Sequence, residues 1–256
     1  MGLVGTVRDV LRRMSEIELL DRVYVIAAGT FVSVLPLLLL VTGALGASPS
    51  RGESLLAVQL IQRLGLDGSA ADAVRALLPS SSLRFYAVGL AITFFGLYSL
   101  SRRAAHAYAA IWQIPDLPRN RLWRALVWIL LQLAAILSVG IVRDQARGAE
   151  PTARLALFVT IGIIWYATEL AGQRLITDRQ VTWGRLHLAA GLTTVARLGV
   201  AVWASIYLAT SLARQAELYG PIGVVFAMFT SLFATIAATL IATLIAATLT
   251  TRRPSS

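Results

Sequence analysis

Long apolar stretches, separated by short polar segments, dominate the pattern of the chain. Six of them are long enough to cross a bilayer, because about 20 apolar residues in a helix are sufficient. We place these spans at residues 23–46, 85–104, 122–142, 153–171, 188–212 and 220–250. The pattern predicts an all-α polytopic membrane protein with six transmembrane helices. Residues 23–250 are expected to form one membrane domain, followed by a cytoplasmic tail at 251–256.

The segment before the first span is amphipathic. Within residues 3–20, Leu3, Val7 and Leu11 belong to one apolar helical face, whereas the charged residues fall elsewhere. Residues 1–22 are therefore expected to form a cytoplasmic amphipathic segment. Two interpretations are open: the helix lies on the membrane surface with its arginines near lipid phosphates, or it covers neighbouring helices as an ordinary solvated helix.

The first span contains a proline, and we expect it to be a membrane span and not a cleaved signal peptide. Its apolar run exceeds the roughly 7–15 residues of a signal peptide core. Pro36 lies mid-helix, removes one backbone donor and frees a carbonyl, which predicts a kink or local opening. Ser33 is a candidate partner for the freed carbonyl.

Two of the polar connections carry structure of their own. Residues 47–83 are expected to form a short extracytoplasmic helical hairpin, with helices at 54–64 and 70–78 ended by Pro79. The second spanning helix is expected to continue past its apolar part to Trp112, before Pro115 and Pro118. Residues 172–187 form a basic connection with Trp183 as an interfacial aromatic.

The charge balance indicates membrane orientation. Only 14% of the residues are charged, yet the formal net charge is +10, and all 23 basic residues are arginine. They lie between the apolar stretches and form no single stripe, so we expect no nucleic-acid partner. With six spans, 14 arginines lie on the side of the termini and 8 on the other side. The excess predicts that both termini are cytoplasmic.

Two ionisable residues fall within the apolar spans. Glu169 lies near the cytoplasmic end of the fourth span, and Arg197 lies in the fifth. A charge at the centre of a bilayer costs at least about 2.5–3.5 kcal/mol, so it normally faces a partner or a water-filled cavity. One hypothesis is that the two face one another or a shared polar cavity, with Arg197 contacting an anionic substrate. The alternative, preferred for Glu169, is that Glu169 sits at the interface and Arg197 extends to the headgroups.

The last span has a composition suited to helix packing. It opens with Tyr219, Gly220, Pro221 and Gly223, and small hydroxyl residues then recur every four positions at Ser231, Thr235, Thr239 and Thr243. A face of small residues lets another helix approach closely. We therefore expect this helix to be a packing element among the others. The alternative is a generic anchor whose hydroxyls bond carbonyls of their own helix.

The sequence gives no sign of catalytic or metal chemistry. There is no cysteine, there are only 2 histidines, and the 13 acidic residues are dispersed. No phosphate-binding glycine-rich motif is present. We expect no catalytic residues, no metal site, no cofactor and no ATP hydrolysis by this chain.

Four motifs together resemble the YihY/BrkB family of bacterial inner-membrane proteins. They are Ser33 to Leu40, the arginine-containing stretch 97–112, Val181-Thr182-Trp183, and Tyr219 to Gly223. The resemblance implies a six-helix plasma-membrane protein with cytoplasmic termini. The family is associated with virulence, serum resistance and envelope lipid phenotypes, and is usually described as a transporter without an assigned substrate. An older ribonuclease label finds no support in this sequence.

The chain departs from the family pattern in three places. The usual aromatic pair before Ser33 is missing, and Ala189-Ala190-Gly191 replaces a Pro-Gly at the start of the fifth span. Ala242-Thr243-Leu244 stands where the resemblance implies Gly-Ala-Glu.

These observations lead to a main hypothesis of membrane translocation of a lipid or other envelope amphiphile. A gradient or partners would drive it, along a route near Pro36, Arg197 and the small face of the last span. The expected partners are the bilayer, anionic lipid and an unidentified substrate, and an oligomer is compatible with the sequence. The second hypothesis is a non-transporting scaffold that binds envelope machinery through residues 47–83 and the cytoplasmic arginines. A membrane-bound enzyme is the third.

Overall fold

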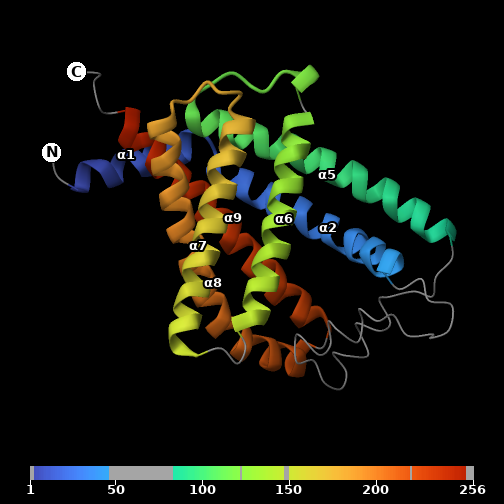
Figure 1. Ribbon diagram of the computed structural model, residues 1–256. Helices are drawn as coiled ribbons and strands as arrows, with labels where there is room; N and C mark the ends of the chain where they lie inside the picture. The colour runs from blue at the N-terminus through green and yellow to red at the C-terminus, as the bar shows by residue number, and fades with distance from the viewer. Residues whose placement is uncertain (1–2, 46–82, 122, 147–149, 220, 252–256) are drawn as a thin grey trace. The chain divides into compact units, whose positions relative to one another are not determined.

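The computed structural model describes residues 3–45, 83–121, 123–146, 150–219 and 221–251 (Figure 1). These residues form helices and short turns, and no strand occurs among them, which confirms the all-α prediction. The elements are α1 (Leu3–Glu16), α2 (Leu19–Leu45), α5 (Leu83–Trp112), the 3₁₀ turn η1 (Arg119–Arg121), α6 (Trp123–Ala146), α7 (Pro151–Ile176), α8 (Trp183–Tyr219) and α9 (Pro221–Thr251). The hairpin predicted at 47–83, with helices at 54–64 and 70–78, lies almost wholly outside the described residues.

Four helices in the described part of the chain are long and apolar enough to cross a membrane. The qualifying segments are Trp123–Gln145, Thr152–Ile176, Trp183–Tyr207 and Val225–Thr251. They coincide with the third to sixth predicted spans. The first two predicted spans coincide with α2 and α5, but side chains at 34–45 and 83–90 are not among those described. The count of six spans therefore stays a prediction.

The outward faces of α6 and α7 are apolar. Leu130 and Leu137 on α6 are 61% and 70% exposed, and Leu155 and Ile163 on α7 are 66% and 62% exposed. Soluble proteins rarely leave such a continuous apolar surface uncovered. These faces are suited to contact with lipid tails.

The described helices differ in extent from the approximate spans placed from the sequence. The connection predicted at 172–187 is reduced to residues 177–182, since α7 continues to Ile176 and α8 begins at Trp183. The amphipathic segment predicted at 3–20 is interrupted after Glu16, where Glu18 adopts a left-handed backbone conformation (φ 49°). The second span, in contrast, continues to Trp112 as predicted. Loss of apolar character marks the membrane boundary, whereas a helix ends only where its backbone turns.

The described chain divides into two compact units. The first contains Met1–Ile26, Leu100–Val202 and Ala234–Ser256, and the second contains Ala27–Ser99 and Trp203–Phe233. The helices α2, α5, α8 and α9 each contribute residues to both. The units are described separately below, beginning with the first.

The α6–α7 hairpin forms one side of the first unit. The buried residues of α6, Ala125, Ile129, Ala135 and Val139, repeat at the spacing of one helical face. At Gly172 on α7, an added Cβ would lie 2.6 Å from Trp128 Cδ1 on α6. Only glycine leaves room there for the indole ring.

The part of α9 in the first unit is buried as its small residues predict. Ala246 and Thr243 have no exposed surface, and Thr239 is 5% exposed. The hydroxyls of Thr239 and Thr243 also donate to the carbonyls of Thr235 and Thr239, each at 2.8 Å. These hydroxyls bond the backbone of their own helix, so the small face is buried without leaving their protons unpaired.

The helix α1 is joined to the first unit by Arg13. Its guanidinium donates to the backbone carbonyl of Ile111 on α5 and to Thr248 Oγ1 on α9, both at 3.1 Å. Burial lowers the pKa of Arg13, while Glu16 acts in the opposite direction, and the group stays charged. Val7 and Leu11, on the predicted apolar face, are 49% and 59% exposed. The helix is thus attached through a charged residue, and part of its apolar face is exposed.

Replacing Gly172 by alanine should destabilise the protein by about 1–3 kcal/mol, because the new methyl group overlaps the indole of Trp128. Gly140→Ala on α6 is the matched control, since nothing lies within 4 Å of its added Cβ. Thermal unfolding of the full chain in detergent, followed by size-exclusion chromatography, compares them. Equal melting temperatures for the two variants would contradict the close approach.

Replacing Arg13 by glutamine should release α1. Its two buried hydrogen bonds are charge-assisted, and losing them should accelerate amide hydrogen exchange within α1 about tenfold or more. Arg12→Gln provides the control, because Arg12 is 68% exposed and forms a surface ion pair with Glu16. Unchanged exchange in Arg13→Gln would show that α1 is held by other contacts.

Candidate functional site

A buried ion pair joins α7 and α8 in the first unit. Arg197 Nη2 lies 2.7 Å from Glu169 Oε1. The side chain of Glu169 has no exposed surface, and that of Arg197 is 13% exposed. The structure therefore brings together the two residues that the sequence left open as partners. The preferred sequence interpretation, with Glu169 at the membrane interface, is wrong, because its carboxylate is enclosed by protein.

Two further helices complete the pair. From α6, Gln132 donates to Glu169 Oε1 at 3.1 Å and accepts from Arg197 Nη1 at 3.3 Å. From α9, Thr239 Oγ1 accepts from Arg197 Nε at 3.1 Å. The guanidinium carbon also lies 4.4 Å from the centre of the Trp165 ring, a cation–π distance. Four helices thus meet at one guanidinium group.

Several polar atoms beside the pair are buried and have no hydrogen-bond partner. They are Glu169 Oε2, both amide atoms of Gln173, and Trp128 Nε1. Gln173 lies one turn beyond Glu169 on α7. Leaving such a group unpaired costs about 1–3 kcal/mol, so burying these four atoms on α6 and α7 lowers the stability of the folded protein. Their donors and acceptors are available to a molecule or proton that enters the site.

Removing either charge of the Glu169–Arg197 pair should destabilise the folded protein. Among the described residues, Glu169 is the only buried acid and Arg13 the only other buried charged residue. The charges of Glu169 and Arg197 cancel, so removing one leaves the other uncompensated in a poorly hydrated place. Tyr108 on α5 packs edge-on against Trp128, at a ring distance of 6.2 Å, and closes this side of the site.

A second polar group holds the turn between α7 and α8. Asp178 forms ion pairs with Arg121 in η1 and Arg124 on α6. Asp178 and the next residue both adopt left-handed conformations, with φ values of 49° and 64°. Arg174 donates to the carbonyl of Val181 at 2.7 Å and lies 4.7 Å from the Trp183 ring. These contacts fix the ends of the two helices that carry Glu169 and Arg197.

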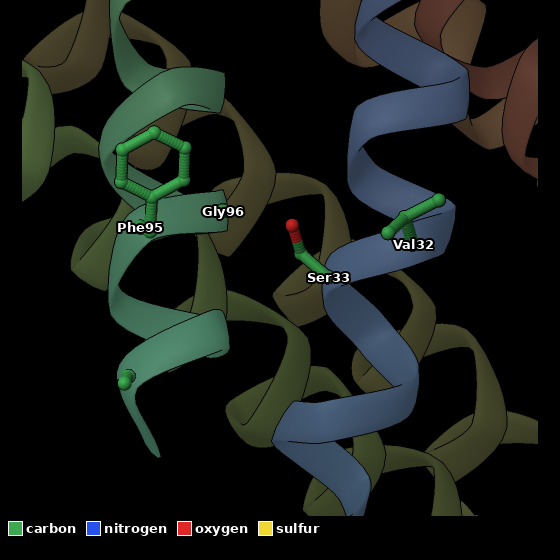
Figure 2. Close-up of a pocket in the computed structure, with 5 residues that line it drawn as sticks. Val32, Ser33, Phe95 and Gly96 are labelled. Atoms are coloured by element: carbon green, nitrogen blue, oxygen red, sulfur yellow. The ribbon is translucent and has the colours of Figure 1, made fainter. Parts of the chain in front are cut away.

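The residues Ser33 and Pro36 belong to the second unit. Ser33 lines a pocket of about 410 Å³ between α2 and α5, together with Val32, Ala91, Phe95 and Gly96. Figure 2 shows the Ser33 hydroxyl directed toward Gly96. That hydroxyl donates to the Gly29 carbonyl at 2.8 Å, so its single proton is not available to the carbonyl freed by Pro36, which corrects the predicted partnership. The side chain of Pro36 is outside the described set, and α2 is helical through it.

The beginning of the last span follows the sequence motif. α8 ends at Tyr219 and α9 begins at Pro221, a position where the missing backbone donor has no helical partner to lose. Gly223 is buried, whereas Gly220 is not among the described residues. Farther along, Ser231 and Thr235 are partly buried and Thr239 reaches the ion pair.

Sequence reasoning missed three residues of the site: Gln132, Trp165 and Gln173. Gln132 gave a usable signal, because it is an isolated amide in the apolar run from Leu126 to Val139. Gln173 gave none because it lies just beyond the predicted span, and Trp165 gave none because it is one apolar residue among others within it. Thr239 was identified only as a packing residue.

Similarity to one known family covers nearly the whole chain. Residues 10–256 match the family Virulence factor BrkB. The chain belongs to the BrkB family. No curated protein and no solved structure shows significant similarity to it. This BrkB-family chain is thus a membrane protein, with apolar helices long enough to span.

The chain's departure from the BrkB pattern falls in the buried part of α9. Leu244 stands where the family resemblance implies a glutamate, and both Leu244 and Thr243 have no exposed surface.

Breaking the pair should cost the BrkB-family protein about 3–5 kcal/mol in either single variant, Glu169→Gln or Arg197→Gln, because a buried group loses its partner. The double variant should recover part of this loss, since neither charge remains. A double-mutant cycle on thermal unfolding measures the coupling. The exposed pair Arg12–Glu16 is the control and should couple by about 1 kcal/mol or less. Additive losses at Glu169 and Arg197 would show that the pair does not act as a unit.

Proposed function

We propose that this protein moves a lipid or another amphiphile of the cell envelope across the bacterial plasma membrane, without hydrolysing ATP or carrying out other catalysis itself. The observation that supports it is the Glu169–Arg197 pair, held by four helices with unpartnered polar atoms around it. Ionisable residues inside membrane helices are expensive and generally serve transport or proton movement. A purely structural contact would be met more cheaply by apolar packing.

The orientation in this proposal has six spans and both termini in the cytoplasm. Segments that the arginine count assigns to one side are joined by contacts in the first unit. Arg13 connects α1 to the ends of α5 and α9, and Asp178 connects the α7–α8 turn to the start of α6. Such contacts between segments distant in sequence agree with an even number of crossings between them.

An amphiphilic substrate suits the chemistry of the site. The guanidinium of Arg197 recognises anionic groups such as phosphate or carboxylate. The exposed surfaces of α6 and α7 in the same unit are apolar. A charged headgroup and an apolar tail would each find a matching surface. In this proposal, the exposed apolar residues of α1, Val7 and Leu11, lie against the membrane surface.

Reconstituted protein should accelerate the movement of fluorescent phosphatidylglycerol between the leaflets of liposomes, measured by chemical quenching of the outer leaflet. Arg197→Ala should lower the rate at least tenfold, because the headgroup loses its cation. Arg143→Ala, an exposed residue at the end of α6, should transport like the wild type.

Equal rates in wild-type, Arg197→Ala and empty liposomes, across phospholipid and lipid-precursor probes, would refute the translocation proposal. The scaffold alternative then makes its own prediction. Deleting residues 47–83 should remove co-purifying envelope proteins, whereas a translocation route through the first unit should keep its flux.

A further inference from the structure

The buried pair has no net charge, because one positive and one negative group cancel. Arg197 is permanently charged, and Glu169 is the single buried acid among the described residues. The guanidinium has five N–H groups, of which three are used by Glu169, Gln132 and Thr239. The remaining two can bind an additional acceptor without displacing these partners.

The two charged groups differ in access. Arg197 keeps 13% of its side chain exposed, whereas Glu169 has none. An anion arriving from outside therefore meets Arg197 first. With Glu169 ionised, the occupied site would carry one net negative charge in a poorly hydrated environment, which is strongly unfavourable. One proton on Glu169 restores neutrality.

The carboxylate has a place for that proton. Oε1 already accepts from Gln132 and Arg197, whereas Oε2 has no partner. A proton on Oε2 creates a donor one helical turn from Gln173, whose amide oxygen is also an unpartnered acceptor. Protonation thus matches the atoms that the ionised state leaves unsatisfied.

The groups that face Glu169 restrict which of them can titrate. Arg197 faces it from α8, and Tyr108 on α5 lies within electrostatic range of both charges. The facing groups of α6 and α9 are Gln132, Trp128 and Thr239, which do not ionise near neutral pH. The carboxylate of Glu169 is therefore the group at this site whose charge a single added proton would neutralise.

We propose that Arg197 binds an anionic group together with the uptake of one proton by Glu169, so that the site couples anion and proton binding. The step converts a carboxylate and a proton from water into a carboxylic acid, and no other bond changes. By thermodynamic linkage, the anion promotes protonation and the proton promotes anion binding to the same extent. The inference rests on the proposed function for its transport role, but the linkage itself is a binding property.

The full chain in phosphatidylcholine nanodiscs tests the linkage directly. Dihexanoyl phosphatidylglycerol is the probe, because its phosphodiester keeps one negative charge throughout the pH range used. Calorimetric titration in buffers of different ionisation enthalpy should show about one proton taken up per lipid bound. The dissociation constant should rise about tenfold per pH unit wherever free Glu169 is ionised. Dihexanoyl phosphatidylcholine, which has no net charge, should cause no uptake.

Variants locate the proton. Glu169→Gln mimics the neutral acid and should bind the probe with no proton uptake and no pH dependence, whereas Glu16→Gln on α1 should behave like the wild type. Arg197→Gln should lose binding. Binding by the wild type without proton uptake, or uptake that persists in Glu169→Gln, overturns the proposal. If Glu169→Gln does not fold, the pH dependence of wild-type binding still decides it.

Dimethyl phosphate, which lacks acyl chains, separates the sources of the anion. Proton-linked binding of both probes would support the linkage and show that a free anion is sufficient as the ligand. Proton-linked binding of the lipid alone would also support the linkage and show that the ligand is a lipid headgroup. Linked binding without leaflet exchange in liposomes would refute translocation but keep this inference. Leaflet exchange together with anion binding that takes up no proton would support translocation and refute this inference.

Discussion

A charged side chain inside a membrane helix is costly unless it has a polar partner or water, and in the first unit an opposite charge at hydrogen-bond distance is that partner. Arg197 obtains it from Glu169 on the preceding helix, while Gln132 bonds both members and Thr239 occupies the remaining side. Each contact fixes the rotation of a different helix about its axis. The ion pair therefore determines which faces of α6 to α9 point inward.

Thr239 shows how a small side chain can serve packing and polarity together. Its hydroxyl donates to the Thr235 carbonyl, which frees its oxygen to accept from Arg197. An alanine there would pack equally closely but would leave the guanidinium one acceptor short. The regular hydroxyl spacing of α9 is thus compatible with both a close helix contact and a polar site at one position.

Much of the architecture could be predicted from the sequence, because apolar runs of sufficient length can only be membrane helices. The burial of Thr243 in α9 and the continuation of α5 to Trp112 also followed from composition and periodicity. Pairing between helices could not be predicted: whether Glu169 meets Arg197 depends on the vertical register of α7 against α8, which no local pattern encodes. Gln173 became recognisable only once its burial and missing partners were known.

The contact between Gly172 and Trp128 also constrains how related sequences can diverge. A larger residue at position 172 would collide with the indole, so it can be accepted only together with a smaller residue at position 128. Since Gln132 and Glu169 lie about one turn from this contact, an uncompensated change would separate their helices and weaken the site. Substitutions at 172 and 128 should therefore be inherited as pairs, which makes the size of these two residues a guide to which relatives keep the same helix spacing.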